Sequence, residues 1–166
     1  MIAEIGHFAL LLALALALLQ SVAPIWGARR GDAALMGLAR PLAGGQFLFI
    51  AAAFAMLIAL YVRSDYSVAN VWQNSHADKP LLYKISGTWG NHEGSMLLWV
   101  MILAFFGSLV ALFGSNLPVR LRAIVLAVQA WVASAFLVFI LATSNPFLRL
   151  DPAPGEGQGL NPILQD

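Results

Sequence analysis

Four long runs of apolar residues dominate the chain, at residues 5–26, 44–62, 95–113 and 123–142. About 20 helical residues at about 1.5 Å each cross the hydrocarbon core of a bilayer, which is about 30 Å thick. The runs are continuous and rich in Ala and Leu, without the alternation expected of barrel strands. The pattern therefore predicts an all-α integral membrane protein, a bundle of four transmembrane helices.

Composition agrees with this fold class. Hydrophobic residues make up 60% of the chain and charged residues 10%, whereas soluble domains are about half apolar and about a quarter charged. The net charge of +1 gives no reason to expect nucleic acid as a partner. Because the chain has no cysteine, it can hold neither a thiol nucleophile nor a disulfide nor a thiolate metal site.

The arginines predict how the bundle is oriented in the membrane. Cations accumulate in short cytoplasmic connections. The first and third connections are the arginine-rich ones: Arg29, Arg30, Arg40, Arg120 and Arg122. We therefore expect the N-terminus, the C-terminus and the long connection at residues 63–94 to face the outside, which is the periplasm in a bacterium with two membranes.

One polar, glycine-rich segment lies directly before the third span. Its members are Gly87, Thr88, Trp89, Gly90, Asn91, His92, Glu93, Gly94 and Ser95. Glycine allows a positive φ or the close approach of another surface, and tryptophan suits a membrane boundary. Asn91 or Ser95 can cap the third span, and Glu93 suits its positive end. We keep two interpretations of Glu93 and His92, a structural one and contact with a polar ligand or partner.

The rest of the long connection predicts a short helix. Val68, Val71 and Trp72 are spaced like one face of such a helix. The opposite face holds Asn70, Gln73 and Asn74. This pattern favours a segment in the plane of the membrane interface.

Small residues recur every four positions in the apolar runs, which predicts close helix packing. The sets are Ala9, Ala13 and Ala17; Ala51, Ala55 and Ala59; Ala104 with Ser108 and Gly107 with Ala111; and Ala130 with Ser134. Three glutamines also fall within the runs: Gln20, Gln46 and Gln129. We expect these glutamines to be too few, and at too mixed depths, to line a transport path.

Catalytic and metal-binding patterns are weak. His7, His76 and His92 have no second histidine or carboxylate at metal-ligand spacing, apart from the neighbouring Glu93. His92 and Glu93 would point in different directions on a helix. The sequence holds no Ser/His/Asp set, phosphate loop or paired carboxylates. We predict no catalytic residue and no metal site.

The last segment, residues 143–166, differs in composition from the rest. Its proline and glycine residues are Pro146, Pro152, Pro154, Pro162, Gly155, Gly157 and Gly159. Such a composition excludes a helix and favours extended or turn geometry. We expect a periplasmic tail that is truncated, with the natural chain continuing beyond it.

Residues 75–99, with Gly-Thr-Trp-Gly-Asn-His-Glu-Gly-Ser at their centre, resemble the N-terminal region of the CcmF family of cytochrome c-type biogenesis haem lyases. The chain start Glu-Ile-Gly-His at residues 4–7 and Thr-Ser-Asn-Pro-Phe at 143–147 add to the likeness. The resemblance covers essentially all 166 residues.

The resemblance implies a multi-pass protein of the bacterial inner membrane that handles haem at the periplasmic face. There it joins the haem vinyl groups to the thiols of a Cys-X-X-Cys-His site in apocytochrome c. The implied partners are the remaining segments of the haem lyase, a periplasmic haem chaperone, apocytochrome c with the proteins that present it, and membrane lipid. The segment 87–95 inherits membership of a signature, without an assigned chemical role.

The chain departs from the family pattern in one respect. It lacks the family's Trp-Trp-Asp segment and the histidines that ligate haem, so the implied haem ligands lie outside it and we expect it to be inactive alone. Our hypothesis is an N-terminal part of a haem lyase that scaffolds haem delivery and attachment. The alternatives are a small membrane transport subunit and a membrane anchor that presents a docking loop.

Overall fold

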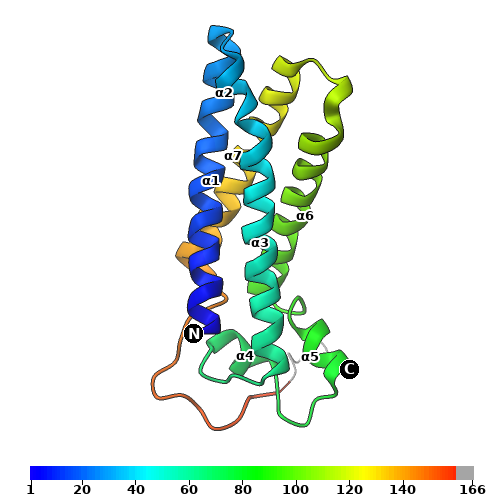
Figure 1. The fold of residues 1–166 in the computed structure, drawn as a ribbon. Helices are drawn as coiled ribbons and strands as arrows, with labels where there is room; N and C mark the ends of the chain where they lie inside the picture. Colours follow the sequence, from blue (N-terminus) through cyan, green and yellow to red (C-terminus); the bar gives the residue numbers. More distant parts are fainter. Residues whose placement is uncertain (160–166) are drawn as a thin grey trace.

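The computed structural model describes residues 1–159 of the 166-residue chain. The helices in this part are α1 (Ile2–Arg30), α2 (Ala33–Gly37), α3 (Ala39–Val62), α4 (Ala69–Asn74), α5 (Leu81–Gly87), α6 (His92–Phe113), the 3₁₀ turn η1 (Gly114–Asn116) and α7 (Val119–Thr143). Four of the helical stretches are long and apolar enough to cross a membrane. They run side by side (Figure 1), which confirms the predicted all-α four-helix bundle.

The two ends of the bundle differ in what they carry (Figure 1). One end, called here the loop end, holds the N-terminus, α4, α5 and the segment after α7. The opposite end, called the arginine end, holds the two short connections and the five arginines at their borders. Each long helix extends past its predicted apolar run at one end or at both. Which end faces the outside stays a prediction.

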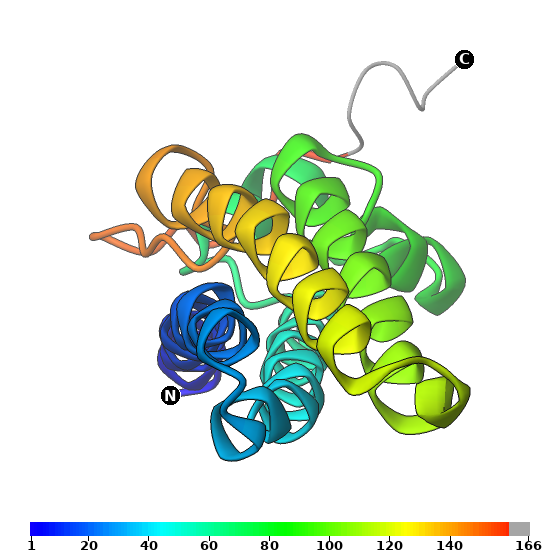
Figure 2. The ribbon, with the colours of Figure 1, turned by 90° about the horizontal axis from the view of Figure 1, so that it is seen from above.

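The helices pack small faces against large ones. α1 lies beside α3, and α7 runs obliquely between α1 and α6 (Figure 2). The predicted small-residue faces are buried on α1, α6 and α7. The predicted face of α3 is wrong, because Ala55 is exposed and Ala51 and Ala59 are only half-buried. Instead α3 turns Ile50 and Leu57 toward the core that also contains the small residues of α1.

A polar contact ties three helices together inside the bundle. The Gln20 amide donates to the Leu126 carbonyl at 2.8 Å and to Gln129 Oε1 at 3.2 Å, and the Gln129 amide donates to the Leu103 carbonyl at 3.3 Å. Gly107 makes room, since a Cβ there would lie 2.6 Å from Gln129 Oε1. Side-chain hydrogen bonds of this kind join helices in lipid. Because the side chains of Gln20 and Gln129 bond to each other, they lie at the same depth in the bundle. The expectation that the glutamines lie at mixed depths is therefore wrong for these two.

The described part of the tail, from Ser144 to Gly159, contains no helix, as predicted. It runs back across the loop end, where Leu150 donates its amide to the Ser67 carbonyl at 2.8 Å. The Leu148 carbonyl accepts from the Ala69 amide at 2.9 Å. The predicted tail also includes residues 160–166, which lie outside the described residues.

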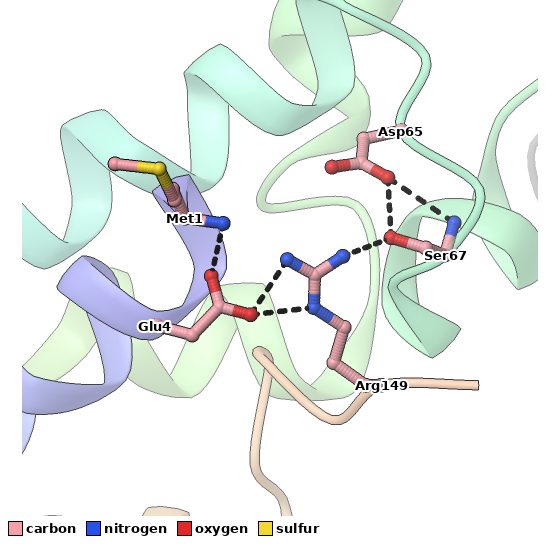
Figure 3. A network of polar contacts seen from close by, with 5 residues as sticks. All are labelled: Met1, Glu4, Asp65, Ser67 and Arg149. Carbon is pink, nitrogen blue, oxygen red and sulfur yellow. Dashed lines mark hydrogen bonds and ion pairs between the residues drawn. The ribbon is translucent and has the colours of Figure 1, made fainter. Parts of the chain in front are cut away.

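Arg149 fixes this tail to the rest of the loop end (Figure 3). Its guanidinium contacts one carboxylate oxygen of Glu4 through Nε at 2.8 Å and through a terminal nitrogen at 2.7 Å. It also donates to the Ser67 hydroxyl, which in turn donates to Asp65. Glu4 is paired with the amine of Met1 as well. The network therefore joins the start of α1, the connection before α4 and the tail.

We expect the substitution Arg149→Met to loosen the tail from the connection before α4. Exposed ion pairs contribute little alone, but a two-pronged guanidinium–carboxylate contact within a network contributes more. The amides of Ala69 and Leu150 should then exchange hydrogen severalfold faster in detergent or nanodiscs. Arg63→Met, at an exposed position of the same end, is the matched control. Unchanged exchange at both amides would show that backbone contacts alone hold the tail.

Candidate functional site

The segment 87–95 is mostly helical in the structure. Gly87 ends α5, a short turn follows, and α6 begins at His92. Within residues 1–159, positive φ angles at glycine occur at Gly31 and Gly159, outside this segment. We expected the glycines of the segment to provide either a positive φ or the close approach of another surface. The first expectation is wrong, because none of these glycines has a positive φ.

Asn91 caps α6 and binds the turn before it. Its Oδ1 accepts the backbone N–H of Gly94 at 2.8 Å, which confirms the predicted cap. Its amide nitrogen donates to the Tyr61 hydroxyl at 2.9 Å and to the carbonyls of Gly87 and Thr88 at 3.0 and 3.3 Å. Asn91 is buried. One side chain therefore holds the end of α5, the start of α6 and the end of α3.

Asn70 of α4 completes the cluster from the other side. Its amide nitrogen donates to Asn91 Oδ1 at 2.8 Å and to Glu93 Oε2 at 3.1 Å, and its Oδ1 accepts the Tyr61 hydroxyl at 2.7 Å. The prediction that Asn70 lies on the outward polar face of α4 is wrong. Val68 and Val71 are fully buried. They hold α4 against the bundle in an orientation that points Asn70 inward, where it bonds to Tyr61.

We call Tyr61, Asn70, Asn91 and Glu93 the asparagine lock. Tyr61 is fully buried, and its hydroxyl both donates to Asn70 and accepts from Asn91. Buried amides and hydroxyls are costly unless they are hydrogen-bonded. Because these groups satisfy one another, the lock joins α3, α4 and α6 through a buried polar network.

Two glycines of the segment pack closely against the lock region. A Cβ at Gly94 would lie 1.6 Å from the Thr88 carbonyl oxygen, which is backbone and cannot turn away. A Cβ at Gly87 would lie 3.5 Å from the Tyr61 ring, an ordinary contact. The close approach of the Thr88 backbone therefore requires glycine at position 94. The contact with the Tyr61 ring does not require glycine at position 87.

Two side chains of the segment face away from the protein. Trp89 and His92 are both exposed, and the His92 ring contacts Phe139 edge-on with the ring centroids 6.2 Å apart. His92 and Glu93 diverge, as expected for neighbours on a helix. Ser95 donates its hydroxyl to the His92 carbonyl at 3.0 Å. An apolar groove of about 240 Å³ lies between α6 and α7, lined by Met96, Ala135, Phe136 and Phe139.

The other two histidines have their own partners. His7 Nδ1 lies 3.2 Å from the Asn145 amide. His76 lies 3.6 Å from Asp78 and 4.0 Å from Glu156. Hydrogen bonds from the backbone amides of Gly157 and Ala77 help to hold the pKa of the Glu156 carboxyl below its usual range. Among residues 1–159, no three His, Asp or Glu side chains gather as a metal site would require.

We expect Tyr61→Phe to lower the free energy of unfolding by about 1–2 kcal/mol, because Asn70 Oδ1 loses its donor in a buried site. Tyr83→Phe, at an exposed tyrosine of α5, is the control and should leave the value unchanged. Denaturant titration in mixed micelles measures both variants. Equal stabilities would contradict the energetic role of the lock.

Gly94→Ala should destabilise the protein by about 3 kcal/mol, because forced overpacking against a fixed atom is costly. Gly44→Ala is the matched control, since a Cβ at that helical position meets nothing within 4 Å. Alanine is otherwise the better helix former by about 0.5–1 kcal/mol. The same unfolding measurement tests this pair, and a Gly94→Ala variant as stable as Gly44→Ala would refute the close approach.

Comparison with known proteins adds to this geometry. The profile of a family described as "Cytochrome C assembly protein" matches residues 89–166, starting inside the segment. The chain is 67% identical over 166 residues to the cytochrome c-type biogenesis protein CycK of Bradyrhizobium diazoefficiens. It is 52% identical over 167 residues to the cytochrome c-type biogenesis protein CcmF of Pseudomonas aeruginosa. Each alignment covers 100% of this chain and 25% of the relative.

A solved structure shows the same fold. A chain titled "Cytochrome c Heme Lyase CcmF" superposes with a TM-score of 0.82 at 27% identity, over 92% of this chain and 26% of that chain. The chain thus spans about a quarter of the length of the relatives that it matches.

Proposed function

Because the chain belongs to the CcmF family of cytochrome c-type biogenesis proteins, we propose that it is the part of a cytochrome c haem lyase that scaffolds haem delivery and its covalent attachment to apocytochrome c. The observation that carries the proposal is the asparagine lock. It fixes the loop end of the bundle through satisfied, buried hydrogen bonds. A fixed platform is what a scaffold needs, since positioning fails when supporting residues are loose.

The described residues do not fit a haem site of their own. His7 lines a cleft of about 490 Å³, but its Nδ1 lies 3.2 Å from the Asn145 amide, and His76 lies beside two carboxylates. His92 is free to face outward, but the groove beside it, about 240 Å³, is smaller than the roughly 300–1,000 Å³ typical of ligand pockets. The proposal therefore assigns the haem ligands to other segments of the haem lyase.

We propose further that the protein lies in the bacterial inner membrane with the loop end in the periplasm. The charge distribution supports this orientation. Five arginines border the two short connections of the arginine end. The four cations of the loop end, Arg63, Lys79, Lys84 and Arg149, are spread over the long connection and the tail. Cations in short connections mark the cytoplasmic side.

The partners proposed are the remaining segments of the haem lyase, a periplasmic haem chaperone, and apocytochrome c with its presenting proteins. All would meet the protein at the loop end. Trp89 and His92 are the outward side chains of the segment available to them. The transport alternative gains no support, because Gln20 and Gln129 bond to each other and to backbone carbonyls.

Single cysteines test the orientation cleanly, because the chain has none of its own. Ala77→Cys lies at the loop end and Ser115→Cys at the arginine end, and both positions are exposed. In cells with a permeabilised outer membrane, a membrane-impermeant maleimide should label position 77 and spare position 115. Labelling of position 115 alone would reverse the proposed topology.

Complementation tests the function. In a bacterium that lacks its own family member, this chain should restore covalent haem on c-type cytochromes when co-expressed with the rest of a close relative, such as CycK of Bradyrhizobium diazoefficiens. Haem-dependent peroxidase staining of separated proteins measures the product. We expect no product with either part alone.

Two controls make that result decisive. Membrane levels of both parts are measured by immunoblot, so that failure with both parts present contradicts the proposal. Gly44→Ala should complement like the parent chain, whereas Gly94→Ala should lose most of the product because the loop end loses its fixed geometry.

A further inference from the structure

Helix α5 exposes a continuous apolar face at the foot of the bundle. Leu81, Leu82 and Tyr83 are 58%, 72% and 56% exposed, and Trp89 just beyond the helix is 41% exposed. Gly87, at the end of the helix, is buried. An exposed apolar cluster of this kind marks a surface that another apolar phase covers.

Trp89 lies two residues beyond the end of α5, in a turn that continues directly from the helix. The Trp89 amide donates to the Ser86 carbonyl at 3.3 Å, so the helical turn continues past Gly87. Leu81, Leu82, Tyr83 and Trp89 therefore form one exposed apolar group on α5 and the turn that follows it.

The orientation of α5 relative to the spans is fixed. Asn91 binds the carbonyls of Gly87 and Thr88 at the end of the helix. Lys84 donates to the Ser64 hydroxyl at 2.7 Å, which ties α5 to the residues just after α3. The exposed face cannot swing freely, so its direction is a property of the fold.

Helix α5 lies at the level where two spans end. α5 projects laterally from the foot of α3 and α6 (Figure 1). It lies between the end of α3 at Val62 and the start of α6 at His92. A helix at that level and direction meets the headgroup region of the surrounding bilayer, where amphipathic helices and aromatic residues settle.

The charges around α5 suit a lipid surface. Between Asp78 and Glu93 the chain holds no acidic residue and two cations, Lys79 and Lys84. The ammonium groups donate to the Asn74 carbonyl at 2.6 Å and to the Ser64 hydroxyl at 2.7 Å, and the segment brings no unpaired acidic group to a phosphate-bearing surface. Tyrosine and tryptophan place their apolar rings in the boundary and their polar atoms in water.

We propose that α5 and Trp89 form an interfacial anchor that inserts into the membrane leaflet at the loop end. The occupant of the face is phospholipid. The anchor resists tilting of the loop end relative to the membrane, because the asparagine lock joins it rigidly to three other helices. The inference rests on the chain spanning a membrane and not on the proposed haem lyase role.

Nitroxide accessibility tests the anchor on the full chain in nanodiscs of phosphatidylethanolamine and phosphatidylglycerol. Leu82→Cys carries the label, Gln73→Cys on the exposed side of α4 is the water reference, and Phe106→Cys on the exposed face of α6 is the lipid reference. Oxygen partitions into lipid, whereas a nickel chelate stays in water. We expect the label at position 82 to show high accessibility to oxygen and low accessibility to the nickel chelate. The ratio of the two should correspond to a depth of about 5–10 Å in the membrane.

Two results would overturn the anchor. Nickel access at position 82 equal to that at position 73 would place α5 in water. Low access to both reagents would show that protein, and not lipid, covers the face. Thermal unfolding of the three labelled variants confirms that each is folded, and Leu81→Cys provides a second reading of the same face if Leu82→Cys unfolds.

Discussion

The hydrogen bond between the side-chain amides of Asn70 and Asn91 is the contact on which the loop end depends. Each amide uses its remaining groups on Tyr61, Glu93 or the backbone, and loss of the Tyr61 hydroxyl leaves Asn70 Oδ1 without its donor. Unpaired buried amides are costly, while a fully satisfied network is rigid. This is why the connection between α3 and α6, which runs from Arg63 to Asn91, holds a defined geometry and does not behave as a free loop.

Polar contacts supply specificity at several depths of the molecule. Between helices in lipid the hydrophobic effect offers no preference among partners. Gln20 and Gln129 fix α1 against α7 inside the bundle, the asparagine lock fixes α3, α4 and α6 near its end, and Arg149 binds the tail at the surface. Small residues then let the backbones approach. Gly94 is the extreme case, because the Thr88 carbonyl occupies the space of its missing side chain.

Local properties could be predicted from the sequence, and non-local ones could not. The length of the apolar runs predicts the four long helices because span length is a local property, and the Asn91 cap follows from a three-residue spacing. Tyr61 and Asn70 lie 30 and 21 residues from Asn91. Nothing in the sequence distinguishes the buried Asn70 from its half-exposed neighbour Asn74. Alanine is so common on α3 that a four-residue repeat indicated the wrong face.

The lock also changes which residues of the signature segment are available to a ligand or partner. Asn91 and Glu93, the groups with the densest hydrogen-bonding capacity, direct it inward to Asn70, Tyr61 and the backbone. A structural role therefore accounts for Asn91, while the half-buried Glu93 contributes one oxygen to the same network. Trp89 and His92 make no such inward bonds and point outward from a rigid turn. The segment thus presents an indole and an imidazole outward, on a turn that the buried amide of Asn91 holds.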